Sequence, residues 1–506
     1  MRSSALSPGD VDVCVIGSGA SGAVAAHALV RAGLRVLLLE EGGRLAAGSS
    51  LTQIQSQWAS SLVLGATGQL EATGRPWTAR ALGGGMALYA GISFRYRHVD
   101  FDARAHTARD ALDPQWPIRY EDLRTDYDEI EALLGIARLA GSDPCEPEGR
   151  AALQPPHSHS AQGELLARAG RSIGKQPFPT PLAINSRPYG GRPRCSQSSP
   201  CNEYVCGSGA RADVVSTLLD PLMHEDGFVL ASPGRALKLQ LVSPDRVGAV
   251  EWLDLGSHQR RTTKVRHVVL AANAIQSSAL LLRSRNRWFP TGVGNHHDMV
   301  GRGLSFKISG YATGHVAAPK VLRGHLKGPH STVSFSDHYI DPHCPTGLGG
   351  ILYEASPDNR RVRDGRMALR VHYLASDQPM RDNRVRISST KDEFGTEQII
   401  TEYSTHPVDV LRLQYLARKA SELLAAADAQ DVTFEATGYE RGSRHLHGGC
   451  RSGDDPATSV TDRQGRVHGV DNISVVDGGV FPYAGGVNPT FTIQANALRI
   501  TRQLIN

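Results

Sequence analysis

The sequence predicts an α/β protein with two lobes, one built on a parallel βαβ unit and the other on an antiparallel sheet. Three observations lead to this expectation. A buried-strand pattern, a glycine-rich turn and a helical pattern follow one another in residues 11–41. Alternating polar and apolar residues in 304–402 are typical of antiparallel strands. The length of 506 residues is too great for one ordinary domain.

The βαβ unit begins with the short, β-branched-rich run Val11–Ile16, which is typical of a buried parallel strand. A helical spacing of apolar residues follows and ends at Gly33. The second buried strand is expected over Val36–Leu39, with Glu40 at its end.

Three glycines between the first strand and its helix form a dinucleotide fingerprint. Gly17 makes the tight turn, Gly19 lets the backbone approach a pyrophosphate, and Gly22 lets helix and strand pack closely. The phosphates then lie at the helix N-terminus. Glu40, 18 residues after Gly22, is placed to accept hydrogen bonds from a ribose. A coincidental glycine turn is the alternative.

The rest of the chain is less regular. Strands are expected at Val268–Ala272 and Ile473–Asp477, and helices at Tyr120–Leu134, Val408–Ala427 and Thr490–Leu504. Gly- and Pro-rich connections dominate 141–200 and 319–350, and the second of these is expected to be an irregular excursion or a lid. Because no regular β/α repeat follows Glu40, the fingerprint favours FAD over NAD.

Composition excludes several classes of protein. The formal net charge of +5 is small, and no run of Lys and Arg interleaved with aromatics accompanies it, so no nucleic-acid partner is expected. The start of the chain lacks the apolar run of a signal peptide, and no later run is long enough to span a membrane. A cytoplasmic location without membrane contact is therefore expected.

The seven cysteines do not form a complete disulfide framework, because their number is odd. Cys195, Cys201 and Cys206 cluster, but their intervals of six and five do not match a tight zinc pair. Free thiols are expected there, with a metal or a single disulfide as the alternatives. No metal site is assigned.

Four segments together resemble the glucose–methanol–choline (GMC) family of FAD-dependent oxidoreductases. Leu82–Gly85 is similar to the family's second glycine-rich turn, and Val269–Ser277 resembles its "VLAAGAIxSP" strand. His445–Arg451 resembles the H-x-x-G-T-C-R motif. Gly465–Arg499 follows the C-terminal signature almost throughout. The order and spacing of these segments, from the fingerprint to Arg499, are more specific than any one of them.

The resemblance implies a discontinuous FAD-binding lobe of the Rossmann-like, p-hydroxybenzoate-hydroxylase-like kind. We expect it to comprise residues 1–105, 195–295 and 440–506. The substrate-binding lobe, an α+β unit with the antiparallel sheet, would comprise 106–194 and 296–439.

The fingerprint and the resemblance together give a set of cofactor contacts. Its members are Gly17, Gly19, Gly22, Glu40, Gly84, Gly85, Ala272, Asp477, Gly478, Pro489 and Thr490. Leu88 stands near the place where some relatives attach FAD covalently to a His, and His98 is too far along to replace it. Non-covalent FAD is therefore expected.

The resemblance implies that His445 is the catalytic base and that Asn488 is the second active-site residue. A neutral His is a suitable base near pH 7, and an Asn can both donate to and accept from a substrate hydroxyl. His447, two residues from His445, is the alternative base. Asn488 could instead brace the turn before Pro489, and Asp477 could be a cap.

Departures from the family pattern lie next to this motif. Gly449 stands where the family usually has Thr, and Ser452 stands where it has Met. The local packing at these two positions is therefore not predicted by the resemblance.

Three further segments bear on the substrate, a small-molecule alcohol. Gly91–Asp102, Cys195–Ala212 and Asn383–Gly395 resemble the bacterial branch that oxidises sugar hydroxyls, including the 6′-hydroxymethyl of aminoglycoside precursors such as paromamine. Glycoside 3-oxidation, a sterol, choline or aryl alcohol, a non-redox flavin lyase and a binding scaffold are the alternatives. Gly91–Asp102 could also be a packing segment only. Oxygen, a quinone and a carrier protein all remain candidate electron acceptors.

Overall fold

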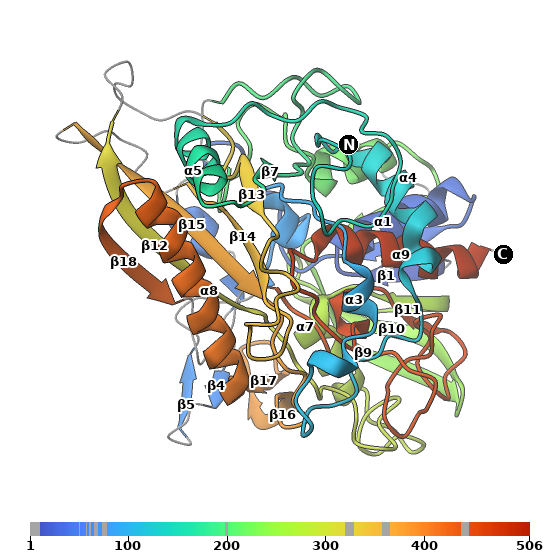
Figure 1. Cartoon of the computed structure of the whole chain (residues 1–506). Helices are drawn as coiled ribbons and strands as arrows, with labels where there is room; N and C mark the ends of the chain where they lie inside the picture. Colours follow the sequence, from blue (N-terminus) through green and yellow to red (C-terminus); the bar gives the residue numbers. More distant parts are fainter. Residues whose placement is uncertain are drawn as a thin grey trace.

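The computed structural model describes residues 11–49, 51–56, 58–59, 62–64, 69–72, 78–197, 201–318, 328–356, 365–436 and 445–505. Two large sheets organise these residues and lie on opposite sides of the molecule in Figure 1. One is largely parallel and contains the predicted βαβ unit, and the other is antiparallel. The predicted α/β architecture is therefore confirmed.

The first sheet has seven strands. In spatial order they are β8 (Phe228–Ala231), β2 (Val36–Leu39), β1 (Val11–Ile16), β11 (Gln259–Leu270), β10 (Arg246–Asp254) and β9 (Gly234–Ser243), with β19 (Ile473–Val475) also paired to β11. The amino half of β11 forms an antiparallel hairpin with β10, and its carboxyl half pairs in parallel with β1. Both strands of the βαβ unit have the predicted bounds.

The four central strands of this sheet end at one edge. Ile16 of β1 pairs with Leu39 of β2 and with Leu270 of β11. Leu270 also pairs with Val475 of β19. Since all these pairings are parallel, the residues that follow the four strands meet at the carboxyl edge, where doubly wound sheets bind ligands.

Helices cover this sheet. α1 (Ala20–Arg31) packs against α9 (Thr490–Ile505), which in turn packs against α4 (Arg124–Leu134). α7 (Asn273–Arg283) packs against β9. α9 thus lies beside α1, although the two helices are far apart in the sequence (Figure 1).

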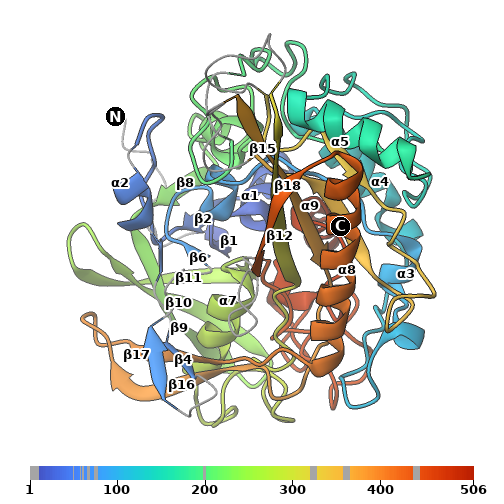
Figure 2. The ribbon, with the colours of Figure 1, turned by 60° about the vertical axis from the view of Figure 1, so that its left-hand side comes forward.

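The second sheet has six strands, which pair in antiparallel fashion throughout its described residues. In spatial order they are β18 (Gln430–Ala436), β12 (Ile308–Ala317), β15 (Arg366–Ala375), β14 (Gly350–Glu354), β13 (Val333–Phe335) and β7 (Phe178–Pro179). Apolar side chains of one face form a core with α8 (Pro407–Ala426) and α5 (Ala161–Ser172), which cover that face in Figure 2.

Smaller elements complete the fold. One small sheet contains β16 (Arg384–Lys391), β17 (Glu397–Glu402), β4 (Leu62–Leu64) and β5 (Leu70–Ala72), and another pairs β3 (Trp58–Ala59) with β6 (Thr78–Ala79). The short helices are α2 (Leu51–Ser56), α3 (His98–Phe101), α6 (Asp220–Leu222), η1 (Gly84–Ala87), η2 (Arg104–His106), η3 (Tyr120–Leu123), η4 (Val215–Leu219) and η5 (Gly478–Val480).

The sequence predicted the long elements more accurately than the connections. The three expected helices correspond to η3 with α4, to α8 and to α9. In the connection 141–200, however, the helix α5 was not predicted. Strand β13 occupies part of 319–350, of which 319–327 lies outside the described residues. The predicted division into two discontinuous domains stays a prediction.

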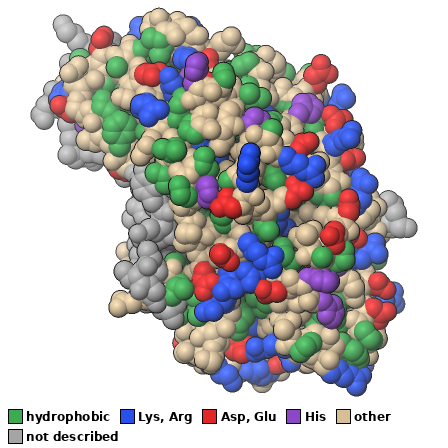
Figure 3. Space-filling model, turned by 60° about the horizontal axis from the view of Figure 1, so that its bottom comes forward, with side chains coloured by type: hydrophobic (Ala, Val, Ile, Leu, Met, Phe, Trp, Pro, Cys, Tyr) green, Lys and Arg blue, Asp and Glu red, His purple; other side chains and the backbone are tan. Residues whose placement is uncertain are grey.

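None of the seven cysteines, all of which lie in the described part of the chain, forms a disulfide bond. On the face shown in Figure 3, Lys and Arg side chains are interspersed with Asp and Glu. Among the residues that the structure describes, no helix is both long and apolar enough to cross a bilayer.

Candidate active site

Four of the predicted cofactor residues lie at the carboxyl edge of the parallel sheet. Gly17 follows β1, Glu40 follows β2, Ala272 follows β11 and Asp477 follows β19. Residues separated by more than 400 positions therefore meet because their strands are adjacent and parallel.

The glycine turn after β1 leaves an uncovered helix N-terminus. A Cβ at Gly22 would lie 1.8 Å from the carbonyl oxygen of Gly17, so helix and strand pack more closely than any side chain allows. At Gly19 an added Cβ would meet nothing within 4 Å. Gly19 is the N-cap of α1, and no side chain caps it. The first turn of α1 can therefore bind an anion.

A second glycine turn lies against the first. A Cβ at Gly84 would come within 3.1 Å of the Cα of Gly19, and one at Gly85 would meet nothing within 4 Å. The Gly83 N–H donates to Ser18 Oγ at 2.9 Å, which ties the two turns together. The result is a cradle of backbone without side chains, which fits a pyrophosphate.

Glu40 is buried beside this cradle. Its Oε2 accepts hydrogen bonds from the Ser18 N–H at 3.0 Å and from the Ser18 hydroxyl at 2.6 Å, and its Oε1 accepts from the Gly42 N–H at 2.9 Å. Burial raises the pKa of this carboxyl to about 6. Each carboxylate oxygen has more than one lone pair, so Glu40 can hold the turn and still accept from a ribose.

Asp477 links β19 to the end of β11. Its Oδ1 accepts from the Gly479 N–H at 2.8 Å, and its Oδ2 accepts from the Ser277 hydroxyl at 2.6 Å. The Ser277 oxygen also accepts from the Ala272 N–H at 3.2 Å. Burial raises the pKa of Asp477 to about 6. Asp477 is therefore the N-cap of η5, one of the roles left open by the sequence, and it lies beside Ala272 and Gly478.

His445 and Asn488 face each other. The Nε2 atom of His445 lies 3.5 Å from Nδ2 of Asn488. Asn488 is 9% exposed, and its Oδ1 atom has no partner among the described residues. Asn488 precedes Pro489 and Thr490, where α9 begins. A half-buried ring nitrogen and an unpaired amide oxygen thus lie together, which suits the binding of a hydroxyl group.

His447 has a different environment from His445. It is fully buried, its ring stacks on Phe481 at 5.5 Å, and its Nε2 lies 3.4 Å from the hydroxyl of Tyr96. Burial, with Lys307 and His445 nearby, holds the pKa of His447 well below its usual range. His447 is therefore a neutral side chain packed in the interior of the protein.

Buried polar groups fix the backbone of the loop that carries Asn488. Lys307 Nζ donates to the carbonyl oxygen of Gly485 at 2.6 Å and to that of Ala484, which also accepts from Tyr96. Burial lowers the pKa of Lys307 to about 7. Next along the loop, the Gly486 N–H donates to the hydroxyl of Tyr339 at 2.8 Å. These contacts fix the backbone two residues before Asn488.

Part of the segment Gly91–Asp102 is buried and contacts the loop that carries Asn488. Arg95 and Arg97 are buried, and they form ion pairs with Glu131 and Asp143 respectively. Tyr96 contacts the loop before Asn488. Arg95, Tyr96 and Arg97 therefore pack within the protein, which corresponds to the packing role that the sequence left open.

One wall of the site comes from the antiparallel sheet and was not predicted. Tyr311, His372 and Tyr353 are neighbours across β12, β15 and β14, on the face away from α8. The Asn488 Nδ2 atom donates to the Tyr353 hydroxyl at 3.4 Å, and this hydroxyl contacts Nδ1 of His372. The alternation in β15 was a usable signal, because it places Arg370 and His372 on one face.

Two family models for GMC oxidoreductases match the chain, the N-terminal one over residues 14–308 and the C-terminal one over residues 379–497. The chain belongs to the GMC oxidoreductase family.

Two relatives agree with this assignment, and a solved structure has a similar fold. The GMC oxidoreductase is 46% identical over 509 residues to "6'''-hydroxyparomomycin C oxidase" of Streptomyces lividus, with 99% of this chain and 93% of the relative covered. It is 45% identical over 494 residues to "paromamine 6'-oxidase" of Streptomyces fradiae, with 96% and 90% covered. In fold it is similar to pyridoxine 4-oxidase from Mesorbium loti, with a TM-score of 0.68, 18% identity, and 98% and 99% of the two chains covered.

As a GMC oxidoreductase, the protein is an FAD-binding enzyme that acts on hydroxyl groups of small molecules. Its two departures from the motif have local structural reasons. Gly449 has φ of +82°, and a Cβ there would lie 2.4 Å from the hydroxyl of Ser278. Ser452 donates from its N–H and its hydroxyl to the Val480 carbonyl, both at 2.9 Å. Small residues therefore fit the GMC loop at these positions.

Proposed function

We propose that this GMC oxidoreductase oxidises a hydroxymethyl group of an aminoglycoside, such as the 6′-hydroxyl of a paromamine-like pseudosaccharide, to the aldehyde. The observation that carries the proposal is the approach of His445 Nε2 to Asn488 at 3.5 Å, next to an amide oxygen without a partner among the described residues. The names of two relatives, with 46% and 45% identity, support this substrate class.

In this proposal FAD lies along the carboxyl edge of the parallel sheet. The glycine turns at Gly17–Gly22 and Gly84–Gly85 hold its pyrophosphate, and Glu40 accepts from a ribose hydroxyl. The open space at Gly19 and at Gly85 supports this placement. The residues that follow β11 and β19 and those that begin α9 complete the site: Ala272, Asp477, Gly478, Pro489 and Thr490.

The chemistry that FAD supplies when bound is acceptance of a hydride from the carbinol carbon. His445 takes the hydroxyl proton on Nε2, so the alcohol loses two electrons and two hydrogens to become a carbonyl. Asn488 orients the substrate oxygen without competing for the proton. Lys307 and Tyr339 fix the backbone of Ala484–Gly486 by hydrogen bonds. This keeps the Asn488 side chain in position beside His445.

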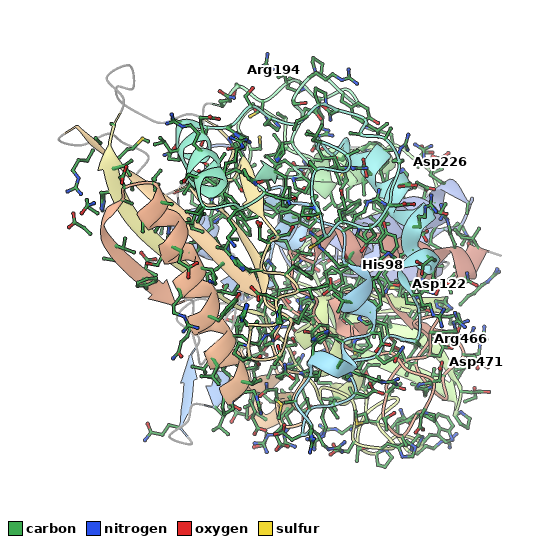
Figure 4. All side chains as sticks on the ribbon, in the orientation of Figure 1. His98, Asp122, Arg194, Asp226, Arg466 and Asp471 are labelled. Atoms are coloured by element: carbon green, nitrogen blue, oxygen red, sulfur yellow. The ribbon has the colours of Figure 1, made fainter. Side chains whose placement is uncertain are left out.

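The FAD is expected to be bound without a covalent link. Leu88 is buried against Ile54 and Ala87 and carries no nucleophile. His98 lies on α3 with an exposed side chain, 3.5 Å from Glu121 (Figure 4). We expect acid precipitation of the purified protein to release all of its yellow colour into the supernatant, as measured by absorbance. Flavin that remains with the precipitated polypeptide would contradict this assignment.

Anaerobic reduction of the flavin by paromamine tests the function. We expect paromamine to bleach the oxidised flavin and to give an aldehyde at the 6′ carbon, detected by mass spectrometry. Choline, benzyl alcohol and a methyl glycoside with only secondary hydroxyls should bleach it at least about 100-fold more slowly. Bleaching by one of these and not by paromamine would favour an alternative substrate class. No bleaching by any alcohol would favour a lyase or a scaffold. Admission of air then tests oxygen as the electron acceptor.

A further inference from the structure

A buried nitrogen in the wall of the site lacks a partner. His372 lies on β15 and is 7% exposed, and its Nε2 atom has no hydrogen-bond partner among the residues that the structure describes. Buried polar side-chain atoms are hydrogen-bonded in most proteins, because an unpaired buried donor or acceptor costs free energy. An unpaired nitrogen beside a binding site is therefore evidence for a ligand group.

The neighbours of His372 determine which of its ring nitrogens carries the proton. If His445 is to accept a proton on Nε2, the Asn488 atom that faces it must be the amide nitrogen, Nδ2. The same nitrogen donates to the Tyr353 hydroxyl at 3.4 Å. A buried hydroxyl hydrogen needs an acceptor, and the Asn488 amide nitrogen is a donor, so the Tyr353 hydroxyl donates its own hydrogen to Nδ1 of His372. In a neutral imidazole this leaves the hydrogen on Nε2.

The charge state of His372 agrees with this tautomer. Burial, reinforced by His330, His445 and Arg370, holds the pKa of His372 well below its usual range, so the ring is neutral near pH 7. The Nε2–H group is then a directed hydrogen-bond donor.

Aromatic packing fixes the direction of this donor. The ring of His372 stacks on Tyr311 with centroids 4.3 Å apart and an interplanar angle of 16°. Tyr353 meets the ring edge-on at 4.8 Å and 82°. Arg370 covers Tyr311 at 3.9 Å from the ring centre. A ring held on both sides cannot turn to find another partner.

We propose that the His372 Nε2–H group donates a hydrogen bond to a second oxygen of the substrate, next to the hydroxyl that His445 and Asn488 hold. The proposal rests on the proposed function. It makes His372 a specificity-determining residue for alcohols that carry a neighbouring oxygen, as the hydroxymethyl group of a pyranose does with its ring oxygen. A simple alcohol leaves this donor unpaired.

Three variants test the donor. His372→Phe keeps an aromatic ring against Tyr311 and removes both ring nitrogens. His372→Gln can place an amide N–H near the position of Nε2. Tyr353→Phe removes the hydroxyl that fixes the tautomer. The control is His315→Gln, because His315 lies on the same face of the sheet as Tyr311, four residues or about 13 Å further along β12.

The first measurement is calorimetric binding of paromamine to the dithionite-reduced holoenzyme, which cannot oxidise it. The second is the substrate dependence of anaerobic flavin reduction. We expect His372→Phe to weaken binding about ten- to hundredfold, with a smaller change in the reduction rate at saturation. His372→Gln should recover part of this loss, Tyr353→Phe should lose affinity in the same direction, and His315→Gln should match the wild type.

Each outcome bears on one claim. Wild-type binding of paromamine by both His372→Phe and Tyr353→Phe would overturn the inference and leave the proposed function intact. Loss of FAD from His372→Phe, measured by flavin absorbance, would also overturn it, because the donor would then serve the cofactor. If His372→Phe does not fold, His372→Gln and Tyr353→Phe decide. A wild-type enzyme that neither binds paromamine nor is bleached by it would refute the proposed function itself.

Discussion

Replacement of His445 by alanine is expected to slow anaerobic flavin reduction by paromamine by about 10²–10⁴-fold, the usual cost of losing a positioned general base. The FAD content should not change, because the glycine turns and Glu40 lie elsewhere in the sheet edge. Stopped-flow absorbance of the flavin measures the rate. If alkoxide formation limits the reaction, higher pH should restore part of the rate, since hydroxide can then remove the hydroxyl proton.

The matched control is His447→Ala. Because His447 is fully buried against Phe481 and Tyr96, its loss should lower the free energy of unfolding by about 2–4 kcal/mol while flavin reduction changes much less. Asn488→Ala should fall between the two histidine variants in rate and should also weaken substrate binding. Near-normal flavin reduction by His445→Ala, or an inactive and well-folded His447→Ala, would reverse the assigned roles.

Two alanine substitutions in the first glycine turn should affect different properties. Gly22→Ala should lower the stability of the fold, and Gly19→Ala should weaken FAD binding. Gly22→Ala places a Cβ 1.8 Å from the carbonyl oxygen of Gly17, and backbone must move to relieve that contact. We expect it to lower the free energy of unfolding by at least about 3 kcal/mol. Denaturant unfolding of the apoprotein measures this change.

Gly19→Ala should leave the stability of the fold unchanged and weaken the binding of FAD. The Gly19 backbone has φ of −65°, which alanine also adopts, and its Cβ would meet no protein atom within 4 Å. That space is where we place the pyrophosphate, so FAD affinity should fall about 100-fold, or about 2.7 kcal/mol. Unfolding of the apoprotein should match the wild type. Unchanged FAD affinity in Gly19→Ala would mean that the pyrophosphate lies elsewhere.

The sequence was informative where a residue type has one physical role. The fingerprint glycines could be located because the turn, the close approach and the helix packing each require a missing side chain. The strand bounds Val11–Ile16 and Val36–Leu39 were predicted because both strands are buried on two sides and read as apolar runs, interrupted in the first only by Asp12.

Contacts between distant segments were not predictable from the sequence. The alternation around His372 gives the face of a strand, but not which strand lies beside it or which loop it meets. The roles of Tyr353 and His372 depend on the approach of β14 and β15 to Asn488, more than 100 residues later. The backbone conformation of Asn273, with φ of +75°, could not be predicted from the sequence either. Asn accepts this left-handed conformation in place of the family's Gly, a detail that only the backbone reveals.

The order of the parallel strands has a consequence for how the enzyme is made. β1 is synthesised well before β19, which completes its sheet, and before α9, on which its helix packs. A nascent chain therefore exposes the apolar side of α1 until α9 has been synthesised. Cofactor capture must follow synthesis of α9, and a truncation that removes α9 should yield an aggregating, colourless product.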